Sequence, residues 1–139
     1  MTGSIPSFAL AVGLLVLSGP VASDDAQPRD ATYSSVCRHA DSGDLLGLEV
    51  SFISEADGGY ALVQRYEGAA IAPVLMQVKQ RERDLVLVSG ATDSIALRQD
   101  GKTLRLTYLD GQLSAAGSSS ENLIPSLAVW QGKSVAACH

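Results

Sequence analysis

The sequence contains few of the residues from which metal centres and acid–base sites are built. Among its 139 residues there are two Cys, two His and one Trp, and aromatic residues make up only 5%. Zinc sites need several Cys or His ligands, and His is the side chain that titrates most readily near neutral pH. We therefore expect no metal ion, no cofactor and no elaborate catalytic machinery.

Basic residues are also scarce. Ten Lys and Arg face fifteen Asp and Glu, which gives a net charge of −5 and a pI near 4.8. Nucleic-acid binding relies on a basic surface that neutralises phosphates, so we expect no nucleic-acid partner. Residues 24–57 carry eight acids and two bases, whereas residues 58–139 carry seven acids and eight bases. The early part forms either a negative patch that attracts a basic protein or only a solubilising surface.

No set of residues has the spacing of a known catalytic motif. Residues 118–120 offer a serine nucleophile, with His39 as base and Asp41 as the orienting acid, but no Gly-x-Ser-x-Gly elbow surrounds these serines. Paired acids such as Asp41 and Asp44 lie in turn-like contexts, where Asp is an ordinary solvated residue. Trp130 and Tyr108 could form a platform for a ligand, but the single Trp of a small β domain more often lies in the core, and we predict that position for Trp130. We therefore predict no catalytic residues and a protein that is not an enzyme.

An uncharged apolar run lies at the N-terminus. Residues 5–22 carry no charge, and residues 8–17 read FALAVGLLVL, which has the length of the hydrophobic region of an export signal. Small residues precede Asp24, so we predict that residues 1–23 form a removable signal peptide. A retained anchor is the alternative, although the run is shorter than the about 20 apolar residues that span a bilayer. We expect a periplasmic or secreted protein without a stable membrane anchor.

Export would place Cys37 and Cys138 in an oxidising compartment, where two thiols of a small domain usually pair. The alternative is a zinc site made by these two residues together with His39 and His139. Cys138 and His139 are adjacent, however, and in a strand they would point to opposite faces. We therefore favour a disulfide, which would close a loop of about 100 residues and stabilise the fold by about 4 to 5 kcal/mol.

Period-two alternation between turn signals predicts an all-β fold. Residues 24–35 are acidic and polar and are expected to form a flexible leader, and residues 36–139 a single domain. In residues 46–52 every second position is apolar, as in a half-buried strand. Asp100-Gly101 lies between two alternating segments and is typical of a tight hairpin.

About eight strands are predicted, at residues 46–52, 60–67, 74–78, 85–88, 94–98, 103–109, 123–130 and 135–138. A small antiparallel barrel with a meander order is favoured, because closure removes exposed edges and brings together the terminal strands that the disulfide joins. A compact β-sandwich is the alternative.

Two stretches near the C-terminus resemble a known family. Residues 114–120 read SAAGSSS and follow a strand, and residues 130–133 read WQGK and precede the last Cys. In order and spacing they are similar to the Ser-Gly-x-x-Tyr loop and the later Trp-x-Lys-Gly segment of the exported inhibitors of c-type lysozyme, the membrane-bound and periplasmic forms of Gram-negative bacteria. The resemblance extends from Thr103 to Cys138.

This resemblance implies a loop that enters the cleft of a lysozyme, where its hydroxyl groups donate hydrogen bonds to the catalytic carboxylates. Ala116 and Ser120 occupy the positions of the family's Ser and Tyr, so Ser114, Ser118 or Lys133 is expected to supply the donor. The partner-binding residues predicted in this way are Ser114, Ala116, Gly117, Ser118, Ser120 and Lys133.

The function expected from the sequence is that of an exported, non-enzymatic protein that binds and occludes a cell-wall hydrolase, first of all a basic lysozyme. An acidic protein would be steered towards such a partner. Two alternatives stay open: a small lipocalin-like barrel that binds an apolar ligand, and a periplasmic immunity or envelope-associated protein with another protein partner.

Overall fold

The computed structural model describes residues 31–53, 59–110 and 119–139, so the predicted signal peptide lies outside the described residues. These ranges contain nine strands and one short 3-10 turn, η2 (Val129–Gln131). The strands are β1 (Thr32–Ser34), β2 (Cys37–Arg38), β3 (Leu45–Ile53), β4 (Tyr60–Ala70), β5 (Val74–Arg81), β6 (Asp84–Ser89), β7 (Thr92–Asp100), β8 (Thr103–Tyr108) and β9 (Ser120–Ser126).

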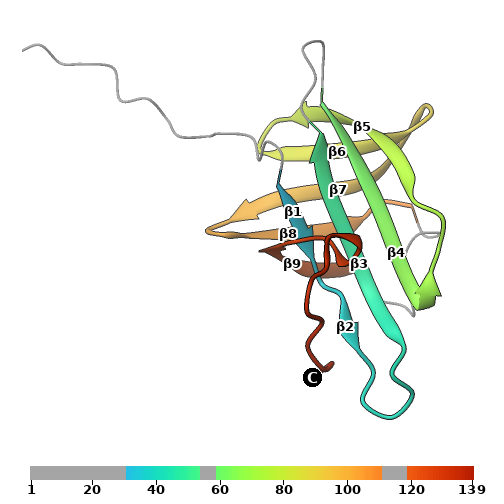
Figure 1. Cartoon of the computed structure of the whole chain (residues 1–139). Helices are drawn as coiled ribbons and strands as arrows, with labels where there is room; N and C mark the ends of the chain where they lie inside the picture. Colours follow the sequence, from blue (N-terminus) through green and yellow to red (C-terminus); the bar gives the residue numbers. More distant parts are fainter. Residues whose placement is uncertain (1–30, 54–58, 111–118) are drawn as a thin grey trace, which may run out of the picture.

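The strands form a closed antiparallel barrel (Figure 1). From β3 to β9 each strand pairs with the next one along the chain, and β1 then pairs with both β9 and β3, which closes the ring. β2 is an additional strand that pairs with the first part of β3. The predicted barrel of about eight strands is therefore confirmed, and the sandwich alternative is wrong.

Tight turns of two residues connect β5 to β6, β6 to β7 and β7 to β8. The β5–β6 and β7–β8 pairs remain in register up to the turn, with Arg81 opposite Asp84 and Asp100 opposite Thr103. The β6–β7 pair shifts register between Leu87 and Val88. Glu82 and Gly101 begin two of these turns with φ of 53° and 58°. A positive φ at the first turn residue matches the twist of the flanking strands. The turn signals in the sequence predicted these hairpins correctly.

The interior of the barrel is filled by the apolar residues of the alternating strands. Tyr33 and Phe52 pack edge to face, with ring centroids 6.1 Å apart. The core cluster consists of Tyr33, Leu48, Val50, Phe52, Ala61, Val63, Met76, Val78, Leu85, Leu87, Ile95, Leu97, Leu104, Leu106 and Leu123. These side chains occupy the positions that would line a lipocalin-like ligand cavity, which argues against that alternative.

The structure differs from the sequence-based prediction at both ends of the domain. Thr32–Ser34 lie in the segment predicted to be a flexible leader, yet they form β1, and Tyr33 belongs to the core. At the other end, the two strands predicted at 123–130 and 135–138 are one strand, β9, followed by η2 and a coil. β1, with three residues, carries too few alternating positions to be recognised by period.

The predicted disulfide is present between Cys37 and Cys138, and it attaches the end of the chain to β2. We call residues 127–139 the C-terminal segment. Its last residues also join β2 through the backbone, because Arg38 N–H donates to Ala136 O and Cys138 N–H donates to Arg38 O. Figure 1 shows the C-terminus beside β2. Within the described part of the chain, no helix is long and apolar enough to cross a membrane.

Candidate protein-binding site

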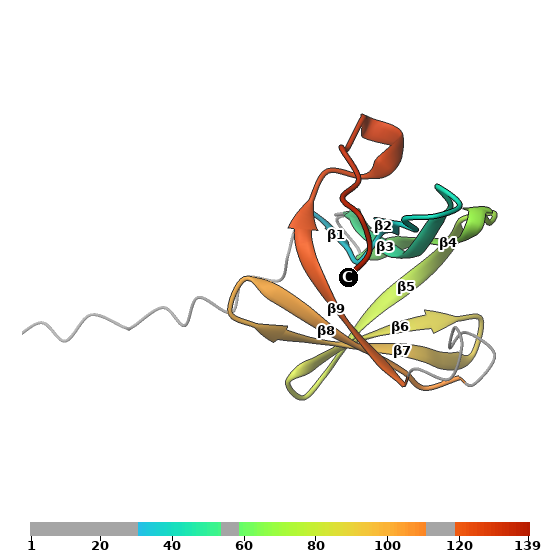
Figure 2. The same cartoon turned by 90° about the horizontal axis from the view of Figure 1, so that it is seen from below.

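The C-terminal segment leaves the end of β9 and crosses the outer side of β3. In Figure 2 its 3-10 turn projects away from the barrel, and the chain then returns towards β2. Two features make this part of the molecule a candidate site. A buried carboxylate fixes the turn from below, and large apolar side chains are exposed on it.

The buried carboxylate is that of Glu49, whose side chain is 1% exposed. Its neighbours in β3 at the positions before and after point into the core, so Glu49 itself faces outwards and is covered by the C-terminal segment. Val129 N–H donates to both carboxylate oxygens, at 3.0 and 3.2 Å. Tyr66 Oη donates to Oε2 at 3.2 Å, and Ser34 Oγ donates to Oε1 at 3.3 Å. A buried carboxylate is tolerated only with such partners.

The network continues to Lys133, one of the residues predicted to contact a partner. Lys133 Nζ donates to Ser34 Oγ at 2.8 Å. Burial lowers the pKa of Lys133, and the nearby Glu49 carboxylate opposes this shift. The ammonium group is therefore engaged within its own protein, where it helps to neutralise Glu49. In this position its main effect is to hold the C-terminal segment on β1 and β3.

Three large apolar side chains are exposed between the second half of β9 and the 3-10 turn. Ile124, Leu127 and Trp130 are 56%, 61% and 69% exposed, and we call them the Trp130 surface. Ile124 is the cross-strand neighbour of Ser34, so it lies beside the Glu49 network on the outer side of the barrel. The prediction that Trp130 lies in the core is wrong, because the residue follows β9 in a turn and has no inward-facing strand position.

Four of the predicted partner-binding residues, Ser114, Ala116, Gly117 and Ser118, lie outside the described residues. Ser120 is the first residue of β9, is exposed, and pairs with Thr107 of β8. Ser120 and Leu127 therefore lie at opposite ends of β9, which at about 3.3 Å per residue separates them by about 20 Å.

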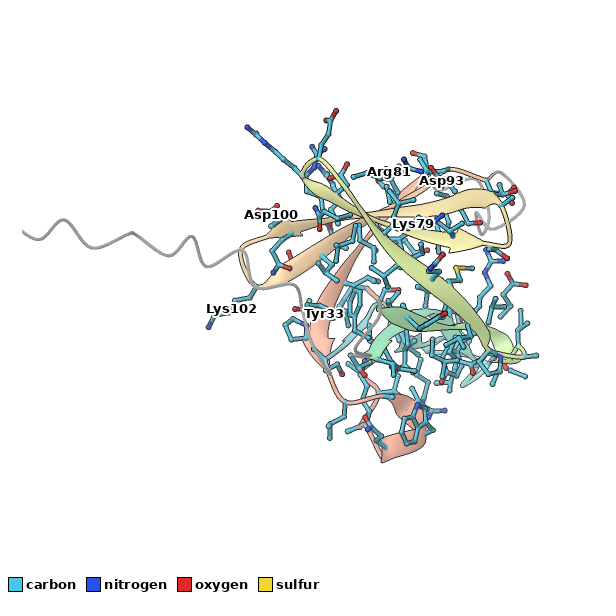
Figure 3. All side chains as sticks on the ribbon, turned by 90° about the horizontal axis from the view of Figure 1, so that it is seen from above. Tyr33, Lys79, Arg81, Asp93, Asp100 and Lys102 are labelled. Carbon is cyan, nitrogen blue, oxygen red and sulfur yellow. A yellow bond between two sulfur atoms is a disulfide. The ribbon has the colours of Figure 1, made fainter. Side chains whose placement is uncertain are left out.

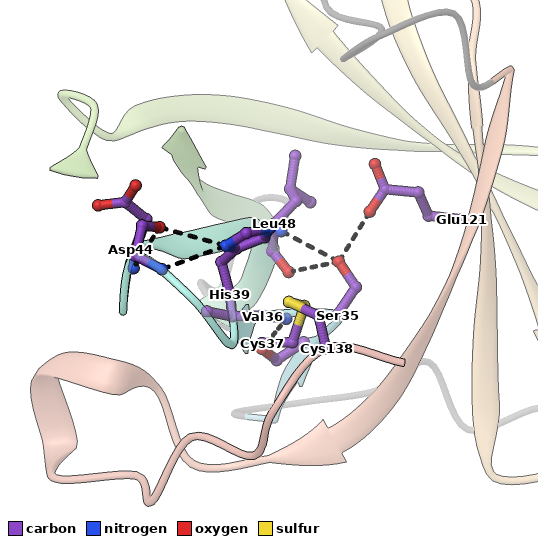
Figure 4. Close-up of a disulfide and its surroundings, with 10 residues drawn as sticks. Ser35, Val36, Cys37, His39, Asp44, Leu48, Glu121 and Cys138 are labelled. Atoms are coloured by element: carbon purple, nitrogen blue, oxygen red, sulfur yellow. Dashed lines mark hydrogen bonds between the residues drawn. A yellow bond between two sulfur atoms is a disulfide. The ribbon is translucent and has the colours of Figure 1, made fainter. Parts of the chain in front are cut away.

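The start of β9 is fixed by a polar cluster at one end of the barrel. Glu121 accepts hydrogen bonds from Ser35 Oγ at 2.7 Å and from Tyr108 Oη at 2.5 Å; Figure 4 shows the contact with Ser35, beside the disulfide. Burial, the hydrogen bond and the charge of Glu121 all raise the pKa of Tyr108. Arg65 lies at the same end and is partnered by Glu67 at 3.3 Å, while its Nη2 is buried and lacks a partner among the described residues.

The residues once considered for catalysis or zinc binding have other roles in the structure. His39 and Ser42 lie in the turn between β2 and β3, where Ser42 Oγ is 3.3 Å from His39 Nδ1. Cys37 and Cys138 are joined to each other and are therefore not available as thiolate ligands. No group of three or more potential metal ligands occurs among the residues that the structure describes.

No pattern in the sequence identifies Glu49, the most important residue of this site. Glu49 stands in a regular alternation, where a polar residue is expected on the wet face of the strand. Its burial is caused by Val129, 80 positions later, and no local pattern contains that information. The sequence singles out Trp130 as the only Trp, but the exposure of its side chain depends on the turn in which it lies.

Comparison of the chain with family models, with curated proteins and with solved structures finds no significant match. The fold and the site are therefore described from this molecule alone.

Proposed function

We propose that the protein is exported and binds a cell-wall hydrolase, first of all a lysozyme, as a non-enzymatic inhibitor. The observation that carries the proposal is the exposure of Trp130 on a turn that a buried carboxylate holds in place. Trp is among the residues that most often dominate the binding energy of protein interfaces. A turn whose backbone is held before binding loses little conformational entropy on docking.

The charge of the molecule supports a basic partner. The net charge is −5, and c-type lysozymes, which the resemblance in residues 103–138 suggests as targets, are basic enzymes. Opposite net charges accelerate the encounter of two proteins. This acceleration becomes weaker as the salt concentration rises. The disulfide and the predicted signal peptide support an oxidising, extracytoplasmic location.

The predicted loop at 114–120 and the Trp130 surface can both take part in such a contact. An interface of standard size buries about 800 Å² on each partner, and an area of that size can extend over the length of β9. In this arrangement the Trp130 surface anchors the partner, and the serine-rich loop supplies hydroxyl donors to its cleft.

The test is the lysis of cell-wall suspensions by lysozymes of several types in the presence of the purified protein. We expect stoichiometric inhibition of at least one type. Trp130→Ala should weaken inhibition by about 30-fold or more, while the free energy of unfolding changes by no more than about 0.5 kcal/mol.

Leu75→Ala is the matched control, because Leu75 is 56% exposed on β5, which lies opposite β9 in the ring of strands. This variant should inhibit as the wild type does. Absence of inhibition at large excess against the whole panel would remove the proposal. Equal effects of the two substitutions would remove the assigned surface.

A further inference from the structure

A groove of about 260 Å³ lies on the outer side of the barrel, over strands β6, β7 and β8. It is lined by Asp84, Ala96, Arg98, Arg105 and Thr107. In the ring of eight strands β7 stands opposite β3. The β8 side of the groove adjoins β9, because Arg105 is opposite Asn122 and Thr107 is opposite Ser120.

The strand register places two arginines side by side in this groove. Arg98 of β7 is directly opposite Arg105 of β8, and both side chains are exposed on the outer face. Like charges at directly opposed positions of an antiparallel pair destabilise a sheet. Asp84 neutralises the charge of only one of the two arginines, because it accepts hydrogen bonds from Arg98 Nε at 2.7 Å and from Arg98 Nη2 at 3.0 Å.

Arg105 has no hydrogen-bond or ion-pair partner among the described residues. Its guanidinium therefore presents a full set of N–H donors, and Arg98 retains the donors of Nη1 that Asp84 does not use. Two guanidinium groups beside a single carboxylate leave an excess of one positive charge in the groove.

The cross-strand neighbours Ala96 and Thr107, two positions along the strands from the arginines, also line the groove. Ala96 is opposite Thr107, and its small side chain leaves a hollow between the neighbouring long ones. Val86 is opposite Ala96, and Lys79 is opposite Val86, so Lys79 stands in the same row two strands away. The hydroxyl group of Thr107 thus adjoins the two arginines, whereas Lys79 lies outside the lining of the groove.

Figure 3 shows Lys79, Arg81 and Asp93 in the same part of the molecule, over β5 to β7. Arg81 and Asp93 form an ion pair at 3.7 Å. Asp100 is exposed at the end of β7, two residues after Arg98. The excess of positive charge is therefore confined to the lining of the groove, where Arg98 and Arg105 outnumber Asp84.

We propose that this groove binds a compact oxyanion of the phosphate-ester class. Arg105 would donate to it through its fork of N–H groups, Arg98 through Nη1, and Thr107 through its hydroxyl. Guanidinium groups match the geometry of phosphate oxygens, and such charge-assisted hydrogen bonds are stronger than neutral ones. The same group is carried by free phosphate, by phosphorylated sugars and by anionic lipid headgroups.

The first experiment titrates the purified protein with inorganic phosphate at low ionic strength and follows the backbone amide resonances. We expect saturable shifts at Ala96, Arg105 and Thr107. Arg105→Gln should weaken binding by about tenfold or more, since hydrogen bonds to charged groups are the stronger class. Arg83→Gln is the matched control, because Arg83 is exposed in the β5–β6 turn and does not line the groove.

The second experiment distinguishes the sources of the phosphate group. It measures co-sedimentation with phosphatidylglycerol vesicles and, as a neutral control, with phosphatidylcholine vesicles. Sedimentation with the anionic vesicles alone, lost in Arg105→Gln, would support a headgroup ligand. Saturable shifts with inorganic phosphate or glucose 1-phosphate, without sedimentation, would support a soluble ligand.

Two results would overturn the proposal: no saturable shift and no sedimentation with any probe, or binding by Arg105→Gln that equals the wild type. The failure of this inference is distinguishable from the failure of lysozyme inhibition, because phosphate titration and vesicle sedimentation are measured without a hydrolase.

Discussion

The barrel and the C-terminal segment belong to one chain but are held in place in different ways. The barrel is stabilised by many equivalent contacts, namely a continuous ladder of backbone hydrogen bonds and a core of small and medium apolar side chains. The C-terminal segment has few backbone contacts, and depends on a disulfide, a buried carboxylate and the lysine beside it. The barrel is therefore tolerant of single changes at its surface, whereas the segment depends on individual residues.

The difference also separates scaffold from site. The Trp130 surface, which we assign to partner binding, lies on the segment and beside it on β9, where its position is set by a small number of specific interactions. Substitutions that release the segment should therefore alter binding while the barrel remains folded. Three predictions test this comparison, from the largest expected effect to the smallest.

Removing the disulfide should have the largest effect. In the double variant Cys37→Ala with Cys138→Ala, we expect the free energy of unfolding to fall by about 4 kcal/mol, because the loop that is closed spans about 100 residues. Denaturant unfolding of the variant and of the oxidised wild type gives the difference. Reduced wild type should unfold like the double variant. An unchanged midpoint would show that the connection adds no stability.

Removing the buried carboxylate should have an intermediate effect. Glu49→Ala leaves the donors of Val129, Tyr66 and Ser34 without their acceptor, so we expect a loss of about 2 kcal/mol. The fluorescence of Trp130 should change as the turn is released. Asp93→Ala is the control, because this acid is exposed and forms only a surface ion pair with the exposed Arg81. A change within about 0.5 kcal/mol is expected for it. Similar losses in both variants would contradict the role assigned to Glu49.

The smallest effect is expected at Tyr66. Tyr66→Phe removes one hydrogen bond to Glu49 and should lower the free energy of unfolding by about 1 kcal/mol at neutral pH. Desolvation by burial, followed by the charge of Glu49 and the hydrogen bond to it, raises the pKa of Tyr66 to about 12.

The direction of the pH effect follows from this shift. The pKa of an unfolded tyrosine is about 10, so the folded state holds the proton more tightly. The stabilisation is complete below pH 10 and is lost as pH rises from 10 towards 12. Unfolding curves measured across this range should show a steeper decline for the wild type than for Tyr66→Phe. Parallel declines would contradict the assignment.

The parts of the fold that the sequence predicted are those that repeat a local pattern. The alternation in residues 46–52 and the Asp100-Gly101 turn were sufficient for β3 and for the β7–β8 hairpin, and export predicted the pairing of Cys37 with Cys138. These features depend on neighbouring residues in the sequence or on the predicted redox compartment, and the sequence alone indicates both.

The parts that the sequence did not predict depend on single long-range contacts. β1 has only three residues, too few to show a period. Glu49 is buried by a turn that lies 80 residues later. The groove is an intermediate case: the two-residue turn at Gly101 fixes the register of β7 on β8, and this register alone places Arg98 opposite Arg105. That pair could have been found from the hairpin signal, although its relation to Asp84 could not.

The shortest strand of the barrel also sets how the ring can open. β1 contributes three residues to β9 and the same three to β3, whereas β3 and β4 pair over nine positions. If β1 withdraws, the edges of β3 and β9 become unpaired donors and acceptors, which are templates for an extended peptide. An equivalent strand from a second copy has the right sequence to fill the gap. Exchange of β1 between two molecules is thus the route by which this chain would dimerise without any new interface.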